Sequence, residues 1–283
     1  MDAVNPPAHA WHTLSALVAE NGNWSVLSFG GDGGTSEAVQ TQADSTWLLS
    51  VHSAGNSVNY THEPTSWANQ PMRRMYHSTA SSGNGGRTYI SGGLKDDGSG
   101  TTFADVYLYD PASSAFTALP GLPQAIYHHS SVLLSNGTLI VLGGVYTSPV
   151  TESAAVIPFS TLYVLDTTSN VATWVTQTVV GNVPTGRRGA TAVLNGIETT
   201  AFVFGGADAA LATVFGDGWE LNLSSCTWQQ VVTGDQGGLG RDSPCDWLKC
   251  SVGAGSRFDH SAVAIGGDQV AIFGGEFMPI FQI

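Results

Sequence analysis

Five short apolar runs, each closed by a pair of glycines, constrain the fold of this chain more than any other feature. Each run is rich in Val, Ile, Leu or Phe, as expected of a buried β-strand. The first glycines of successive pairs are 62, 51, 62 and 69 residues apart. Such a recurrence indicates that one structural unit is repeated along the chain. The pairs are Gly30 and Gly31, Gly92 and Gly93, Gly143 and Gly144, Gly205 and Gly206, and Gly274 and Gly275.

Other residues recur in step with the glycine pairs. One position before each apolar run is a histidine in the first, second, third and fifth repeats and Ala190 in the fourth repeat. A Ser or Thr follows this position in every repeat. In three repeats an arginine lies three residues before this position. The histidines are His12, His77, His129 and His260, and the arginines are Arg74, Arg187 and Arg257.

A second strand follows the glycine pair and ends in Asp or Asn, which is expected to open a turn with its side chain. An aromatic residue then begins a further strand. The strand ends are Asp110, Asp166 and Asn222, and the aromatic residues are Phe116, Trp174 and Trp228; the first repeat fits loosely, with a strand over 47–51 and then Trp67.

One repeat therefore predicts four antiparallel strands in about 50 to 60 residues, the length of a kelch blade in a β-propeller. A single four-stranded sheet cannot bury both of its faces, so such sheets stack against one another. The glycine pair is expected where neighbouring backbones crowd together and a Cβ atom would clash.

On these motifs the chain resembles the kelch-repeat superfamily, which includes the galactose oxidase central domain and a group of fungal surface proteins. The resemblance covers nearly the whole chain and implies an all-β, kelch-type β-propeller of four-stranded antiparallel blades. We expect four and a half to five blades, a fragment of a ring of six or seven, with open strand edges that favour association. The blades are predicted over 9–69, 70–120, 121–180 and 181–233, with an incomplete blade over 256–283 and a Gly-rich insertion over 234–255.

The composition restricts the partners. The net charge is −13, with only nine Lys and Arg and no basic run, which excludes a surface that reads nucleic acid. Charged residues make up 11%, against roughly 25% in soluble domains, and this favours a secreted protein. No apolar stretch reaches the ~18 residues of a membrane span, and residues 1–11 do not read as a signal peptide. The resemblance implies a secreted, cell-surface or membrane-associated protein; a cytoplasmic protein is the alternative.

The cysteines are Cys226, Cys245 and Cys250. The spacing of Cys245 and Cys250 allows a small disulfide loop, and Cys226 is an alternative partner for either. We favour a disulfide or free thiols over zinc, because only His260 follows the cysteines within reach of a typical zinc motif.

The resemblance to galactose oxidase also suggests copper, which those oxidases hold with two His and two Tyr. The candidate ligands here are Tyr76, His77, Tyr127, His129 and His260. No cysteine precedes Cys226, so the cysteine that those oxidases link to a tyrosine is lacking. We therefore interpret the five residues as structural members of the repeat that hydrogen-bond between blades, and expect no metal or other cofactor.

The function predicted from the sequence is a non-catalytic scaffold that binds a protein or a glycan through its loops. The alternatives are a copper radical oxidase of the galactose or glyoxal oxidase kind, or its inactive descendant, and a cytosolic kelch adaptor. The candidate binding loops are 32–45, 95–104, 145–160, 207–217 and 234–255.

Overall fold

The computed structural model describes most of the chain, and its described residues are β-strands and connections. They contain no helix long and apolar enough to cross a membrane. The chain forms two compact units: the first is 1–127, 135–138 and 166–174, and the second is 128–134, 139–165 and 175–283. The described residues are 10–17, 23–32, 46–52, 57–62, 70–81, 86–95, 97–231, 245–246, 255–266 and 269–276.

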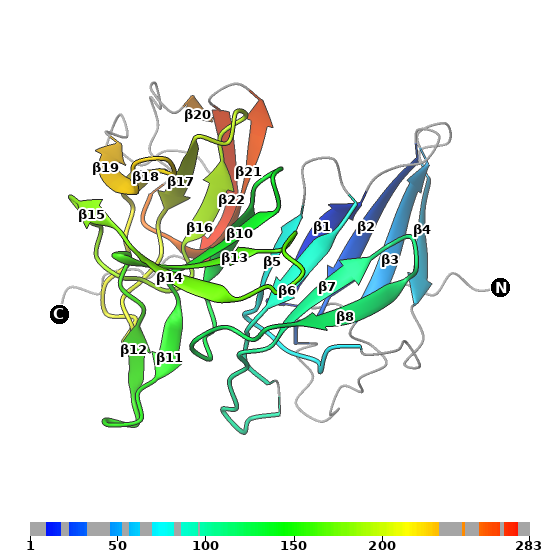
Figure 1. Cartoon of the computed structure of the whole chain (residues 1–283), viewed down its shortest axis with the longest axis horizontal. Helices are drawn as coiled ribbons and strands as arrows, with labels where there is room; N and C mark the ends of the chain where they lie inside the picture. The colour runs from blue at the N-terminus through cyan, green and yellow to red at the C-terminus, as the bar shows by residue number, and fades with distance from the viewer. Residues whose placement is uncertain are drawn as a thin grey trace. The chain divides into compact units, whose positions relative to one another are not determined.

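The first unit holds two blades, each a meander of four antiparallel strands in chain order (Figure 1). Blade 1 comprises β1 (Thr13–Leu17), β2 (Asn23–Phe29), β3 (Thr46–His52) and β4 (Ser57–His62). Blade 2 comprises β5 (Ser78–Ser81), β6 (Thr88–Ser91), β7 (Val106–Asp110) and β8 (Ala115–Leu119).

The second unit holds most of blade 3 together with blades 4 and 5. Blade 3 comprises β9 (Ser130–Leu133), β10 (Thr138–Leu142), β13 (Thr161–Asp166) and β14 (Trp174–Thr178), and its β10–β13 connection carries a hairpin of β11 (Val145–Thr147) and β12 (Ala154–Val156). Blade 4 comprises β16 (Thr191–Leu194), β17 (Thr200–Phe204), β18 (Gly218–Asn222) and β19 (Thr227–Val231), with β15 (Val180–Gly181) added parallel to β19. Blade 5 comprises β21 (Phe258–Gly266), β22 (Gln269–Glu276) and β20 (Cys245–Asp246).

The hydrophobic cores lie between blades. In the first unit, Phe29 of blade 1 packs in one cluster with Ile90 and Tyr109 of blade 2. In the second unit, Phe204 of blade 4 packs with Val270 of blade 5. A sheet that is buried on both faces needs apolar residues at successive positions, which explains the unbroken apolar runs of the sequence.

The predicted fold class, an all-β chain of four-stranded antiparallel blades, is confirmed. The predicted turns are also confirmed. The side chains of Asp110 and Asp166 accept the backbone N–H groups of Ala112 and Thr168, each at 2.9 Å. Asn222 makes the equivalent bond.

The first and fifth blades differ in detail from the sequence pattern. The fourth strand of blade 1 is β4, which follows β3 directly and pairs Tyr60 with Leu49; Trp67, from which a strand was expected, lies outside the described residues. In blade 5, expected to be incomplete over 256–283, the strand β20 from within the predicted insertion pairs with β22. A two-residue strand carries too little pattern to be read from sequence.

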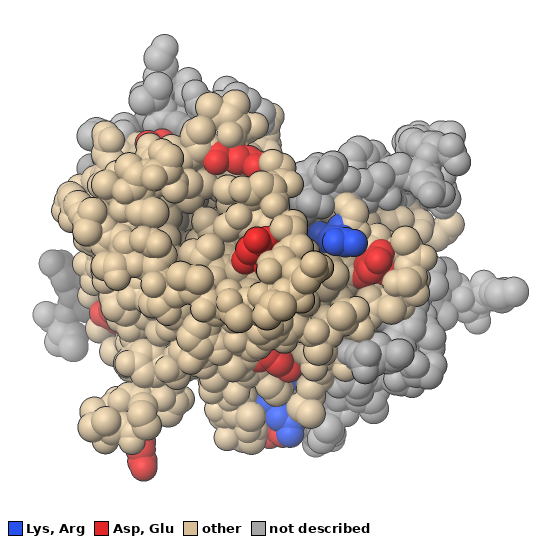
Figure 2. Space-filling model, in the orientation of Figure 1, with Lys and Arg blue, Asp and Glu red and all other residues tan. Residues whose placement is uncertain are grey.

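Few cations reach the surface. Arg73, Arg74 and Arg187 are buried, and Lys95 is paired with Asp97 at 2.5 Å. On the face shown in Figure 2, Lys and Arg atoms are confined to small areas. Among the described residues, free cations therefore neutralise little of the net charge of −13 at the exposed surface.

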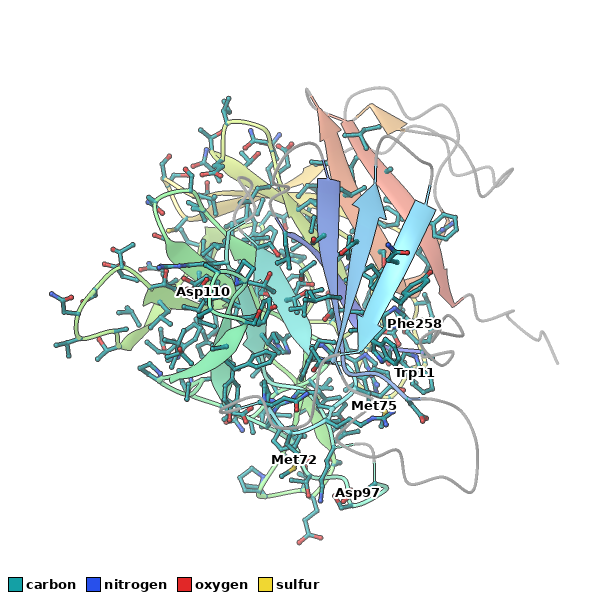
Figure 3. The ribbon with its side chains drawn as sticks, turned by 90° about the vertical axis from the view of Figure 1, so that its right-hand side faces the viewer. Trp11, Met72, Met75, Asp97, Asp110 and Phe258 are labelled. Carbon is teal, nitrogen blue, oxygen red and sulfur yellow. The ribbon has the colours of Figure 1, made fainter. Side chains whose placement is uncertain are left out.

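The meander places two kinds of segment at the same end of each sheet. The connection after the second strand, which begins with the glycine pair, runs at the end where the first strand starts. We call this end of a sheet its glycine face; the described connections there are 92–95 and 97–105 in the first unit, and 143–160 and 205–217 in the second. In Figure 3, Trp11, Met75 and Asp97 of the first unit lie towards this end, and Asp110 lies away from it.

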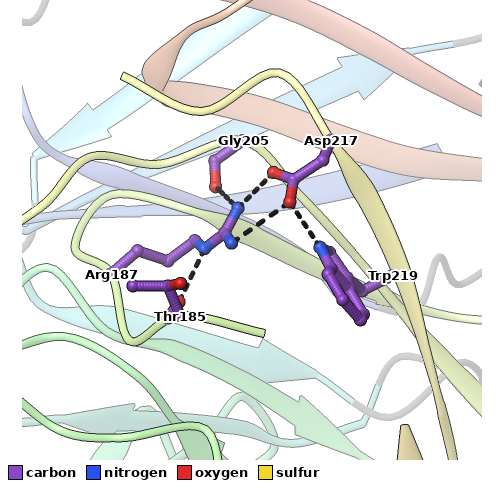
Figure 4. A network of polar contacts seen from close by, with 5 residues as sticks. All are labelled: Thr185, Arg187, Gly205, Asp217 and Trp219. Carbon is purple, nitrogen blue, oxygen red and sulfur yellow. Dashed lines mark hydrogen bonds and ion pairs between the residues drawn. The ribbon is translucent and has the colours of Figure 1, made fainter. Parts of the chain in front are cut away.

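A buried arginine closes the glycine-face connection of blade 4 (Figure 4). Arg187 is 1% exposed and donates to the carbonyl of Gly205 at 3.0 Å and to the carboxylate of Asp217 at 2.5 Å. Its guanidinium lies 4.0 Å from the ring centroid of Phe215. Because Gly205 and Asp217 are the two ends of the connection, the arginine fixes the width of the loop.

Blade 2 repeats this arrangement. Arg74 is fully buried and donates to the carbonyl of Gly92 at 3.0 Å and to the carboxylate of Asp105. It lies 4.1 Å from the ring centroid of Phe103. Two of the three arginines that recur in the sequence, Arg74 and Arg187, are therefore loop clamps.

Replacing this clamp should destabilise the chain strongly. We expect Arg187→Met to lower the free energy of unfolding by about 3 to 5 kcal/mol, because it leaves Asp217 and the Gly205 carbonyl without their buried partner. Urea unfolding followed by tryptophan fluorescence measures this. The control is Arg87→Met at an exposed arginine, for which a change within about 0.5 kcal/mol is expected. Equal losses in the two variants would contradict the role of the clamp.

Candidate functional site

The residue directly before the histidine position has the same unusual backbone in all five repeats. These pre-histidine residues have left-handed φ angles of 53° to 62°. A side chain in this region costs roughly 1 kcal/mol or more, so the surrounding structure must hold it there. The residues are Trp11, Tyr76, His128, Gly189 and Asp259.

Backbone hydrogen bonds hold this row in place. In the first unit, the N–H of Tyr76 points to the carbonyl of Trp11 at 3.4 Å. In the second unit, the N–H of Gly189 donates to the carbonyl of His128, and the N–H of Asp259 donates to that of Gly189, each at 2.9 Å. Within each unit, the pre-histidine residues are thus bonded from one blade to the next at the glycine-face end of the sheets.

Trp11 and Tyr76 form an aromatic pair in the first unit. Their ring centroids are 5.0 Å apart at 46°, and Trp11 is 38% exposed. Met75 lies beside Tyr76 in the chain and forms a two-way backbone bridge to Leu94 of the glycine-face connection. Met72 is 49% exposed. The first unit therefore offers aromatic and thioether side chains to solvent on a backbone fixed by hydrogen bonds (Figure 3).

The second unit has a polar pair at the equivalent positions. Nδ1 of His128 lies 2.8 Å from Oδ1 of Asp259, which is 131 residues away in the chain. Gly189 lies between the two, and a Cβ atom there would overlap the Asp259 carboxylate. Since the carboxylate can only accept, His128 donates from Nδ1. Burial lowers the pKa of His128 even though Asp259 favours its charged form.

Two of the proposed copper ligands instead join blades. Nε2 of His77 in blade 2 lies 2.8 Å from Oγ1 of Thr13 in blade 1, and Nε2 of His260 in blade 5 lies 2.9 Å from Oγ1 of Thr191 in blade 4. Both histidines are buried. Through Nε2, each of these two imidazoles is thus a hydrogen-bonding contact between neighbouring blades, the structural role predicted for it.

The five candidate copper ligands are distributed between the two units. Tyr76, His77 and Tyr127 belong to the first unit, while His129 and His260 belong to the second. Among the described residues, no cluster of three His, Cys, Asp or Glu side chains is arranged to hold a metal ion. Cys226 is a free thiol. The predicted disulfide involves Cys250, which lies outside the described residues.

Comparison with known proteins agrees with this repeated frame. A model of the KLHDC2/KLHL20/DRC7 Kelch-repeats domain matches residues 128–279, and a Kelch motif model matches residues 74–123. This chain belongs to the kelch-repeat family. Its fold as a kelch propeller chain is thereby established independently of the strand pattern.

Among its kelch relatives are the proteins named Kelch domain-containing protein 3. The human protein is 29% identical over 216 residues, and the cattle protein is 28% identical over the same length. Each alignment covers 72% of this chain and 48% of the relative. The chain thus spans about half the length of the curated relatives it matches.

The sequence analysis did not predict the shared backbone conformation of the pre-histidine residues. The signal was present, since one residue precedes each histidine position in step with the glycine pairs. It was hidden because the five residues share no chemistry, and left-handed backbone in non-glycine residues has no sequence mark. The β11–β12 hairpin was also missed, within the loop predicted over 145–160.

The buried kelch histidines should make the chain labile to mild acid. Burial, followed by the charge of Arg257, lowers the pKa of His260 from 6.5 to about 4. Above pH 6.5 the histidine is neutral in both states and stability is unaffected. Below it, the unfolded chain binds a proton that the folded chain refuses, so stability falls until about pH 4. The loss from this residue is roughly 3 kcal/mol.

Urea unfolding of the wild type and of His260→Gln between about pH 7 and pH 4.5 tests this. The variant is expected to be less stable near neutrality but to lose less stability on acidification. The same acid dependence in both proteins would contradict the assignment to His260.

Proposed function

We propose that this chain is a non-catalytic kelch scaffold that binds a protein partner through its glycine face. The observation that carries the proposal is the row of pre-histidine residues. The backbone there is the same in every repeat, whereas the side chains are Trp, Tyr, His, Gly and Asp. A fixed frame with variable side chains at one end is the design of a recognition surface, since rigid elements there present diverse groups.

The first unit supplies anchors of the expected kind. Trp and Tyr are enriched among the residues that dominate protein interfaces, and Met adapts to irregular partner surfaces. Trp11, Tyr76 and Met72 are partly exposed at the glycine face. Loop clamps at Arg74 and Arg187 limit the loss of freedom on binding, which favours affinity.

The charge supports a partner that is not strongly acidic. With a net charge of −13, the chain repels polyanions and attracts a basic protein surface at long range. A glycan ligand is the less favoured form of this proposal, and an oxidase is not favoured by any observation on the described residues. The cell-surface location stays a proposal, supported by the low content of charged residues and by the resemblance to surface kelch proteins.

Peptides selected on the immobilised chain from a random peptide library test the site. We expect Trp11→Ala and Tyr76→Ala each to weaken the enriched peptides at least about tenfold, because aromatic anchors carry most of the energy of such contacts. Fluorescence anisotropy with labelled peptides measures the affinity, and circular dichroism confirms that the variants are folded.

The matched control is Val171→Ala. Val171 is 78% exposed in the β13–β14 connection, at the end of blade 3 opposite to the glycine face. Its replacement is expected to leave peptide affinity unchanged. If Val171→Ala weakens binding as much as Trp11→Ala does, or if neither aromatic variant weakens it, the proposed face is wrong.

Counting thiols in the folded chain tests the proposed location. A surface protein with the Cys245–Cys250 disulfide should show one reactive thiol without reductant, Cys226, and three after reduction and unfolding. Three reactive thiols in protein purified without reductant would contradict an oxidising location.

A further inference from the structure

Some asparagines of this chain are followed directly by glycine, and the structure describes two of them. Asn136 lies in the turn between β9 and β10, and Asn195 lies in the equivalent turn between β16 and β17. Asn21 and Asn84, also followed by glycine, lie outside the described residues. At an Asn-Gly pair the backbone nitrogen of the glycine reaches the side-chain amide of the asparagine easily, because glycine has no side chain to hinder the approach.

The turn at Asn136 holds the side-chain amide close to the backbone nitrogen of Gly137. The N–H of Thr138 donates to Oδ1 of Asn136 at 3.0 Å. The ring closed by this bond contains both Cγ of Asn136 and the nitrogen of Gly137, so the two atoms are kept near each other. When that nitrogen attacks Cγ, negative charge develops on Oδ1, at which the N–H of Thr138 is already directed. Asn136 is exposed, so water has access to it.

The turn at Asn195 instead holds the side-chain amide at both ends. Oδ1 accepts the N–H groups of Thr199 at 2.8 Å and Thr200 at 3.1 Å. Nδ2 donates to Oγ1 of Thr199 at 3.0 Å. These bonds draw the amide across the turn, towards the start of β17. To react with the nitrogen of Gly196, the amide has to rotate and leave these partners, which slows the reaction.

The neighbouring turn of blade 3 explains why residue 137 is a glycine. Its φ is +86°, and a Cβ atom there would overlap Cγ2 of Thr168. The carbonyl of Gly137 accepts the N–H of Thr167 at 3.0 Å and the hydroxyl of Thr167 at 2.7 Å. That hydroxyl also accepts the O–H of Tyr89 of blade 2 at 3.1 Å. The packing that requires a glycine at this position therefore also keeps a reactive Asn-Gly pair in the chain.

We propose that Asn136 is a site of spontaneous deamidation, where the folded chain converts asparagine to aspartate and isoaspartate. The nitrogen of Gly137 bonds to Cγ of Asn136 as the Cγ–Nδ2 bond breaks, and the proton of that nitrogen leaves with the ammonia. Water then opens the resulting succinimide ring at either of its carbonyl groups. One opening gives aspartate, and the other gives isoaspartate, in which the main chain runs through the former side chain. Water is the only co-reactant.

The two products affect the turn differently. An aspartate at 136 still has a side-chain oxygen that accepts the N–H of Thr138, so the turn is retained. An isoaspartate adds a methylene group to the main chain directly before Gly137 and displaces the carbonyl of this glycine from Thr167. We therefore expect the isoaspartyl chain to lose the hydrogen bonds that connect Gly137 through Thr167 to Tyr89, and to be less stable than the original chain.

Incubation of the full chain in mildly alkaline buffer, followed by peptide mapping with mass spectrometry, tests the proposal. In the folded chain, Asn136 should deamidate at least about tenfold faster than Asn195, because only Asn195 has to break hydrogen bonds of its amide first. The matched reference is the same chain unfolded in urea, where both sites are Asn-Gly pairs in a flexible chain and should react at similar rates. Equal rates in the folded chain, faster reaction at Asn195, or no reaction at Asn136 would overturn the proposal.

A variant at the protected site tests the cause of the difference. Thr199→Val removes the hydroxyl that accepts Nδ2 of Asn195, at an exposed position. It should speed deamidation of Asn195 about threefold or more in the folded chain and leave the rate at Asn136 unchanged. An unchanged rate at Asn195 would contradict protection by these hydrogen bonds.

Urea unfolding before and after incubation tests the structural consequence. Wild type should lose stability as isoaspartate accumulates, which an isoaspartyl methyltransferase used as a reagent quantifies. The control is Asn136→Gln, whose longer side chain cyclises far more slowly, while Asn21, Asn84 and Asn195 are retained. Its stability should change less on incubation. An equal loss in both proteins would contradict the connection through Thr167, and none of these outcomes depends on whether the glycine face binds peptides.

Discussion

The buried arginine of the repeat is the interaction on which the described structure depends, because one residue links two blades. Through its side chain, Arg187 closes the connection of its own blade between Gly205 and Asp217. Through its backbone carbonyl, it accepts the N–H of Gly144 from the blade before, at 2.9 Å. Loss of the guanidinium would release the loop and, with it, the carbonyl that holds the neighbouring blade.

The buried charge of Arg187 is tolerated because its guanidinium is hydrogen-bonded to Gly205 and Asp217 and lies over the ring of Phe215. Burial acts to raise the pKa of Asp217, but hydrogen bonds from Arg187 and Trp219 outweigh it and hold the pKa below its ordinary value. The carboxylate therefore stays ionised and paired. An ion pair of this kind adds less to stability than it would lose if one partner were removed, which suits a device that fixes geometry.

The sequence predicted the repeated part of this frame and failed where the pattern is short or the chemistry varies. Glycine pairs, apolar runs and Asx turns recur, so each occurrence supports the others, and the blades follow from them. The strand β20 has two residues and no pattern of its own. The contact between His128 and Asp259 joins residues 131 positions apart. It requires a glycine at position 189, and this requirement becomes visible only when blades 3, 4 and 5 are in place.

The same comparison between repeats decides how the tempting histidines are read. Tyr76-His77 resembles a ligand pair, yet in the structure His77 contacts Thr13 of the neighbouring blade, whereas Tyr76 is a pre-histidine residue. Two adjacent residues thus have different roles. Position within the repeat separates them, whereas residue type alone points to a metal.

At the junction between blades 3 and 4, other residues replace the phenylalanine and the histidine that meet between blades 4 and 5. Here Leu142 replaces the phenylalanine and Ala190 replaces the histidine. The space next to Gly143 is filled by the ring of Phe159, which stacks on Trp228 with centroids 5.4 Å apart.

The polar contact at this junction is rearranged as well. Without an imidazole to meet, the hydroxyl of Ser130 donates to the backbone carbonyl of Ala190 at 2.5 Å. Both large side chains are thus lost together, and a ring from the blade 3 connection supplies the missing volume. A close-packed core requires that the volume of the missing side chains be replaced, and Phe159 does this here.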